Sequence, residues 1–351
     1  MTTHRWSPTR RDLLRGATLA GLGVVAAPRA ICAQAIASDP VDLAAAKREG
    51  QVVWYTSTPV EAAQKIARLF EEGTGIRVEL FRSGGSAVMS RFSQELNAGR
   101  VAVDLLTTSD PATSALLGKR GVFVAFRPKN FEKIPEPAKE PSGQFIAQRL
   151  NMLGMFARED RVAAADMPRA WSDLVNPKYK GKLVMPDPSF TALQLMVVGT
   201  LSKLYGWSFY EKLRANETMI VQGHQQVSDV LKRGERVIAA EGLDSYAYDD
   251  RKAGHKIVTI YPTDGTFAVP SPSAVVKGGP NPNAAKAFAE FMIGDAVQKM
   301  FPGEGIYAAR IDVSPPPGNP ELGGLKLIAV DYDYIERESK SIKERFNEIF
   351  Q

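Results

Sequence analysis

Val52-Val53-Trp54-Tyr55-Thr56-Ser57 begins the segment that decides the fold. This short β-rich run ends in hydroxyl side chains, and residues 63–70 then carry apolar side chains at helical spacing. The same order follows again, with a strand pattern over 76–80, a helical pattern over 89–96 and a third strand pattern over 101–106. Strands alternating with helices through short connections predict parallel pairing and right-handed crossovers.

Hydroxyl-rich loops follow all three predicted strands. In an open parallel sheet, ligands bind beyond the carboxyl ends of the strands. The first two loops also open a helix, where unpaired N–H groups and the helix dipole attract anions. A tight turn with a helix cap is the purely structural alternative for residues 83–86. The candidate ligand-binding residues of this edge are Thr56, Ser57, Ser83, Gly84, Gly85, Ser86, Thr108 and Ser109.

A second α/β region extends from about Gln144 to Thr266. Its strand patterns at 182–185 and 237–240 each lead into a polar loop, and the first loop precedes a long apolar helix over 192–205. Thr191 has a structural alternative as the cap of that helix. The candidate ligand-binding residues of this region are Asp187, Ser189, Thr191, Gln226, Asp244 and Tyr246.

The first 35 residues have the composition of an export signal. Paired arginines, Arg10 and Arg11, precede an apolar run over 17–27 and an Ala-Gln-Ala site at 33–35. The paired arginines indicate the twin-arginine route, which reads them as an address. We therefore expect residues 1–35 to be removed and the protein to work in the periplasm.

Removing this leader changes the charge and the cysteine content. The leader carries five arginines and one aspartate, so it contributes +4 of the chain's +5, and it holds the only cysteine, Cys32. The remaining chain has no basic run of the kind that binds nucleic acid. Its 316 residues (351 less 35) suit two lobes.

Short motifs lie at residues 52–57, 70–76, 82–86, 103–106, 171–174, 176–182, 261–266, 270–273 and 305–307. Together they resemble the periplasmic solute-binding proteins of ABC importers, type II class. This group includes ferric-ion, phosphonate and thiamine binders. The resemblance implies two α/β lobes, each a mainly parallel sheet flanked by helices, joined by two crossover strands near 152–156 and 267–271.

The resemblance also implies a domain division and partners. We expect lobe 1 at 36–145 and 270–351, and lobe 2 at 146–269. The expected partners are a small-molecule solute and the permease subunits of an ABC importer in the inner membrane, with the binding protein itself a monomer. Solute binding between the lobes would favour the closed form, which docks on the permease.

The residue types favour an organic anion or zwitterion, of carboxylate or phosphonate type, as the solute. The alternative is ferric ion held by Tyr246 and Tyr248, because ferric binders of this group use a tyrosine pair. That pair is usually adjacent, whereas Ala247 separates the two tyrosines here. No other cofactor is expected.

An exported enzyme is the more distant alternative. The part of the chain after the leader contains no cysteine and none of the motifs His-Glu-x-x-His, P-loop or Gly-x-Ser-x-Gly. Its loops offer hydrogen-bond donors and little acid–base chemistry, so we expect a binding protein without catalytic residues.

Overall fold

The predicted strand–helix alternation is present at the start of the fold. The computed structural model describes residues 38–136 and 138–351, so the predicted leader, including Cys32, lies outside the described residues. Strand β1 pairs in parallel with β2 and β3. The elements of this first half of the sheet are β1 (Gln51–Thr56), α2 (Val60–Thr74), β2 (Arg77–Arg82), α3 (Gly85–Asn97), β3 (Leu105–Thr107) and α4 (Pro111–Lys119), preceded by α1 (Leu43–Glu49).

Strand β3 is shorter than the pattern over 101–106 predicts. The buried Asp104 carboxylate accepts hydrogen bonds from the Val53 N–H at 2.7 Å and from the Asn281 amide at 2.8 Å. A side chain therefore takes the place of a backbone partner just before the strand begins.

The second half of the sheet repeats the arrangement around β5. Strand β5 pairs in parallel with β6 and β7. Its elements are β5 (Leu183–Pro186), α5 (Ala192–Tyr205), α6 (Ser208–Ala215), β6 (Met219–Val221), α7 (His224–Arg233), β7 (Ile238–Leu243), α8 (Asp244–Lys252) and β8 (Ile257–Ile260).

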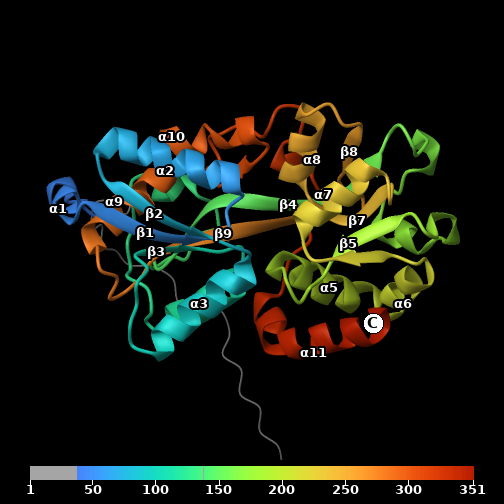
Figure 1. Cartoon of the computed structure of the whole chain (residues 1–351), viewed down its shortest axis with the longest axis horizontal. Coiled ribbons are helices and arrows are strands. Elements are labelled where there is room, and N and C mark those ends of the chain that lie inside the picture. Colours follow the sequence, from blue (N-terminus) through green and yellow to red (C-terminus); the bar gives the residue numbers. More distant parts are fainter. Residues whose placement is uncertain (1–37, 137) are drawn as a thin grey trace, which may run out of the picture. The chain divides into compact units, whose positions relative to one another are not determined.

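Two long strands join the halves, as the resemblance implies. Strands β4 (Ile146–Arg158) and β9 (Phe267–Val275) pair with each other antiparallel and contain the crossovers expected near 152–156 and 267–271. The strand order is β2-β1-β3-β9-β4-β7-β5-β6, with β8 and β10 also pairing with β4 (Figure 1). The predicted α/β fold with two crossover strands is confirmed.

The C-terminal part of the chain contacts both halves. Helix α9 (Pro282–Met292) packs on α1 and β1, whereas α11 (Tyr332–Phe350) packs on α5 and α6 (Figure 1). Ile335, Ile342 and Phe346 of α11 are buried in the core of the second half, although the predicted division assigns 270–351 to lobe 1. The lobe boundaries stay a prediction. The shorter elements are α10 (Asp295–Gln298), β10 (Tyr307–Ala308) and 3₁₀ turns at Phe131–Lys133, Ala164–Asp166, Trp171–Val175, Pro177–Tyr179, Phe301–Glu304 and Leu322–Gly324.

Each half has its own aromatic core. In the first half, Trp54 and Phe70 pack against Phe288 of α9, with ring centroids 5.2 and 4.7 Å apart. In the second half, Trp171 and Phe346 lie in one apolar cluster with the helices α5 and α6. Among the described residues, no helix combines the length and apolar composition that crossing a bilayer requires.

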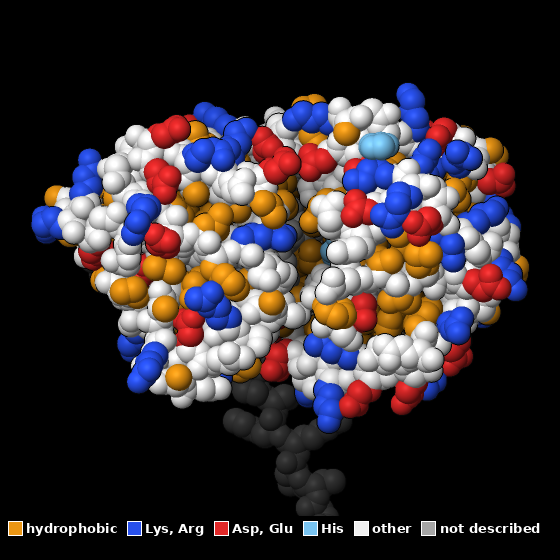
Figure 2. All heavy atoms as spheres, in the orientation of Figure 1, with side chains coloured by type: hydrophobic (Ala, Val, Ile, Leu, Met, Phe, Trp, Pro, Cys, Tyr) orange, Lys and Arg blue, Asp and Glu red, His pale blue; other side chains and the backbone are white. Residues whose placement is uncertain are grey.

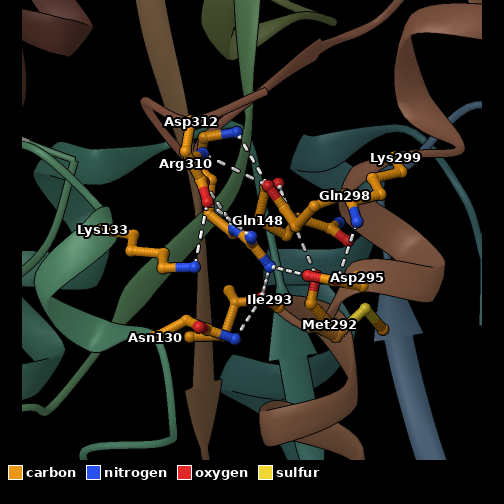
Figure 3. Close-up of polar contacts among 11 residues, drawn as sticks. Asn130, Lys133, Gln148, Met292, Ile293, Asp295, Gln298, Lys299, Arg310 and Asp312 are labelled. Carbon is orange, nitrogen blue, oxygen red and sulfur yellow. Dashed lines mark hydrogen bonds and ion pairs between the residues drawn. The ribbon is translucent and has the colours of Figure 1, made fainter. Parts of the chain in front are cut away.

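A buried polar cluster around Arg310 holds the start of β4 in place (Figure 3). The Arg310 guanidinium forms ion pairs with Asp295 at 2.6 Å and Asp312 at 2.8 Å. The side-chain oxygen of Gln298 accepts hydrogen bonds from the Arg310 and Ala309 N–H groups, and its amide donates to the Gln148 carbonyl at 2.7 Å. Gln148 immediately precedes Arg149 in β4.

Candidate functional site

A cleft of about 1050 Å³ lies between the two halves of the sheet. The carboxyl ends of β1, β2 and β7 and the amino ends of α3, α5 and α7 reach its walls, as expected for a ligand site in parallel sheets. Figure 2 shows the surface hollowed between the halves, with acidic side chains gathered on both sides of one end of the groove.

The loops of the first half converge on this cleft. Ser57, Ser83 and Ser109 line it, and the Ser57 and Ser109 hydroxyl oxygens lie 3.4 Å apart. Ser109 also lies 3.1 Å from the hydroxyl of Ser271 on the crossover strand β9. The sequence-based expectation that these loops meet at one edge is therefore met in the geometry.

Helix α3 directs its amino end toward the same space. Gly84 is its N-cap residue and Gly85 its first residue, and no side chain caps the helix. A methyl group added at either glycine would meet nothing within 4 Å. The helix end is therefore not capped by a side chain, and both glycines line the cleft. Ser86 also lines the cleft and donates to the Phe190 carbonyl of the other half at 3.1 Å.

Two arginines that were not among the predicted site residues line the cleft between these loops. Arg149 of β4 is 2 % exposed and donates to the Thr58 hydroxyl at 2.9 Å and to the Ser109 hydroxyl at 3.3 Å. Arg82, at the end of β2, donates through Nε to the Thr58 carbonyl at 2.9 Å. Within 38–136 and 138–351, no carboxylate forms an ion pair with either guanidinium.

The burial of Arg149 close to a second cation, Arg82, is electrostatically unfavourable in the ligand-free protein. Burial, together with the charge of Arg82, lowers the pKa of Arg149 to about 9. Arg149 is thus still charged at neutral pH, and its charge has no counter-ion in the described residues. Such an uncompensated buried cation is a strong attraction for an anionic ligand.

The signal for Arg149 is present in the sequence. It is the only charged residue between Gln144 and Ala157, a run otherwise apolar or uncharged. A lone cation in a buried strand must find a partner, and a ligand can serve as one. Arg82 lies directly before Ser83, within a motif that the sequence singled out for its glycines and serines.

Tyr246 of α8 faces these arginines from the second half and lines the cleft. Burial raises the pKa of its phenol, although Arg82 and Arg149 act in the opposite direction. The neutral hydroxyl can donate to a ligand oxygen or present its ring face.

The remaining wall comes from the starts of α5 and α7. Thr191 and Gln226 line the cleft, and Thr191 makes no capping hydrogen bond, so its hydroxyl stays available. The imidazole of His224, which also lines the cleft, contacts both carboxylate oxygens of the buried Glu241 at 3.0 and 3.1 Å through Nε2. His224 was not among the predicted site residues, and Glu241 lies behind it, outside the cleft lining.

Other predicted residues lie outside the cleft lining and are bonded within the protein. The Asp244 carboxylate is buried and accepts from Thr259, Tyr261 and Asn319 at 2.7–2.8 Å. Asp187 accepts from the Ser189 N–H at 2.7 Å, which forms a local turn. Thr56 and Thr108 are buried behind the loops, where their hydroxyls contact Thr58 at 2.7 Å and Ser114 at 3.4 Å.

The two tyrosines of the ferric alternative do not lie together in the cleft. Tyr248 does not line the cleft; its ring packs against Gly305. Residues two apart on a helix do not face the same side, which explains why Tyr246 and Tyr248 diverge. Among the described residues, no group of three or more His, Cys, Asp or Glu side chains is arranged to hold a metal ion.

Comparisons with known proteins fit a binding cleft of this kind. A putative 2-aminoethylphosphonate-binding periplasmic protein of Salmonella typhimurium is 23 % identical, covering 65 % of this chain and 68 % of its own. Iron uptake protein A1 of Synechocystis is 21 % identical, covering 70 % and 71 %. The solved structure of the periplasmic binding protein AfuA from Actinobacillus pleuropneumoniae, with exogenous fructose-6-phosphate bound, superimposes with a TM-score of 0.76 at 21 % identity, covering 86 % and 98 %.

The family assignment follows from a match over most of the fold. Residues 102–338, more than half of the chain, match the family model described as bacterial extracellular solute-binding protein. This segment includes Arg149, Tyr246 and both crossover strands. The chain belongs to the family of bacterial extracellular solute-binding proteins.

Proposed function

We propose that this protein captures a small organic anion carrying a phosphonate, phosphate or carboxylate group and delivers it to an ABC importer. The observation that carries the proposal is the pair Arg82 and Arg149, which line the cleft without a carboxylate partner in the described residues. Ligand oxygens that accept from their guanidinium groups would form charge-assisted hydrogen bonds in a desolvated site.

A tetrahedral oxyanion suits this site best, because it offers three oxygens and up to two negative charges. The guanidiniums can approach from one side, while the open amino end of α3 and the Ser83 hydroxyl approach from another. His224 and Gln226, which also line the cleft, would then contact the uncharged or cationic remainder of the solute. The relative named for 2-aminoethylphosphonate and the neighbour holding a sugar phosphate support this chemical class.

Ferric ion, held by Tyr246 and Tyr248, is the second candidate, supported by the relative named for iron uptake. Two features of the site favour the anion. A metal cation at Tyr246 would lie near two guanidiniums, and burial raises the pKa of the phenol that would have to ionise.

Capture follows the two-state scheme of a hinged binding protein. The solute would bind to one half and stabilise the closed form by contacts with the other, and a permease in the inner membrane would recognise that form. We further propose that the protein acts as a monomer without catalysis, and that it reaches the periplasm by the twin-arginine route.

Calorimetry on the purified protein tests the proposal. The panel is inorganic phosphate, 2-aminoethylphosphonate, fructose 6-phosphate, citrate and ferric citrate. We expect micromolar or tighter binding of at least one phosphorus oxyanion, and about ten-fold weaker binding after joint replacement of Ser83 and Ser86 by alanine. A visible tyrosinate absorption with ferric citrate, lost in Tyr246→Phe, together with no binding of any phosphorus compound, would favour iron instead.

A further inference from the structure

Thr58 is fully buried behind the cleft, in the loop between β1 and α2. It does not line the cleft and would not touch a solute. Both cleft arginines nevertheless contact it: Nη1 of Arg149 donates to its hydroxyl at 2.9 Å, and Nε of Arg82 donates to its carbonyl at 2.9 Å.

Only one assignment of donors and acceptors fits the hydrogen bonds of the Thr58 hydroxyl. The side-chain nitrogens of Gln148, at 2.8 Å, and of Arg149 can only donate, so both lone pairs of the Thr58 hydroxyl accept. Its proton is therefore donated to the Thr56 hydroxyl oxygen at 2.7 Å, which also accepts from the Thr58 N–H at 3.0 Å. Every hydrogen-bonding site of the hydroxyl is used.

The supports of this arrangement come from outside the cleft. The Gln148 carbonyl accepts from Gln298 at 2.7 Å, and Gln298 belongs to the Arg310 cluster (Figure 3). This bond holds the part of β4 that carries both Gln148 and Arg149. Thr58 is thus connected through Gln148 to the Arg310 cluster, and directly to the charged atoms of the site.

We propose that Thr58 is the positioning residue of the anion site, orienting Arg82 and Arg149 for the solute. This inference rests on the proposed function, because it assigns the arginines to an anionic solute. A neutral oxygen is well suited to the role. It orients a guanidinium without cancelling its charge, whereas a carboxylate at the same place would form an ion pair and compete with the solute.

The principal test is Thr58→Val, which keeps the shape of the side chain and removes the hydroxyl. We expect it to weaken binding of the tightest-binding phosphorus compound of the panel by about ten-fold, and we expect Thr58→Ser to remain within about three-fold of the wild type. Thr200→Val is the matched control, because the buried Thr200 hydroxyl has no hydrogen-bond partner in the described residues and does not line the cleft. It should leave the affinity unchanged.

A double-mutant cycle separates positioning from general loss of structure. In the Arg149→Met background, Thr58→Val should cause little further loss, since its effect acts through that arginine. Thr56→Val is a second, independent variant: it removes the acceptor of the Thr58 proton and should weaken binding by about three-fold even if Thr58→Val fails to fold.

The outcomes distinguish this inference from the proposed function. Two results would overturn the role of Thr58 and leave the proposed function intact. One is wild-type affinity in a folded Thr58→Val variant. The other is a double variant in which the losses of affinity from Thr58→Val and Arg149→Met multiply, as for independent residues. If the wild type binds no phosphorus oxyanion and Arg149→Met changes nothing, the proposed function fails and the role of Thr58 fails with it.

Discussion

Arg149 is a buried cation that the protein holds with hydroxyl oxygens. Its contacts to Thr58 and Ser109 fix its direction, yet burial and the charge of Arg82 lower its pKa to about 9. The ligand-free protein therefore bears a desolvation cost at this residue. A binding protein that must attract an anion keeps such a residue although it lowers the stability of the ligand-free fold.

Arg149→Met should consequently separate binding from stability. We expect about 100-fold weaker binding of the solute, from the loss of two charge-assisted hydrogen bonds, together with an unchanged or higher Tm of the ligand-free protein. Calorimetric titration and thermal unfolding measure the two effects. Arg91→Met is the matched control, because Arg91 pairs with Glu95 on the half-exposed face of α3 and does not line the cleft. A large fall in Tm for Arg149→Met would mean that the arginine is structural.

Several cleft residues are predictable from residue type, whereas Arg82 and Arg149 depend on their surroundings in the folded chain. Ser57, Ser83 and Tyr246 were predicted and line the cleft. Asp244 has a suitable type, but three hydrogen bonds from distant segments occupy its carboxylate. Those segments meet only in the folded chain, so no local pattern could show that Asp244 is already satisfied.

Among the helices and strands, the start of α3 is the place where the sequence leaves two alternatives open. Residues 83–86 predict either an anion site or a capped turn, and the helix begins at Gly85 without a side-chain cap. The choice of glycine is not forced by crowding or by a positive φ, since an added methyl group would meet open space and Gly84 has a φ of −60°. The remaining explanation is that glycine at these positions leaves space for a ligand.

Gly85→Ala tests this explanation. The methyl group should project into the cleft and weaken solute binding by about ten-fold or more, while Tm stays the same or rises, since alanine favours the helix by up to about 1 kcal/mol. The control is Gly73→Ala in α2, where an added methyl group also meets nothing within 4 Å and the residue does not line the cleft. It should raise Tm without affecting binding. Equal affinities of the two variants would show that α3 does not approach the solute.

The strand and helix patterns transferred well from sequence to structure, and long-range packing did not. The parallel units around β1 and β5 follow from local alternation, and the crossovers fall where the resemblance places them. The packing of α11 on α5 depends on contacts of Ile335 and Ile342 with residues distant in the sequence. The sequence pattern shows that this face is apolar and does not show what covers it.

At the scale of the whole molecule, acidic residues of the two halves face each other across the cleft. Glu61 of α2 and Glu304 come from the first half, and Asp249 of α8 comes from the second; all three line the cleft. Partial burial, together with the carboxylates of Glu61 and Glu304, raises the pKa of Asp249 to about 6, with Lys252 acting in the opposite direction. Closure of the cleft thus brings like charges together.

Asp249→Asn should remove the resulting pH dependence. The folded state holds this proton more strongly than the unfolded chain does, so stability falls as the pH rises from about 4 to 6 and stays lower above that range. At pH 8 the variant should therefore unfold about 1–3 °C higher than the wild type, a small shift because the side chain is only partly buried and solvent screens its charge. Near pH 4 the two Tm values should coincide.

Glu61→Gln tests the contact between these carboxylates directly. In protein that keeps Asp249, this substitution should lower the pKa of Asp249 that NMR measures. An unchanged titration in Glu61→Gln would mean that the halves do not hold these carboxylates close together in solution.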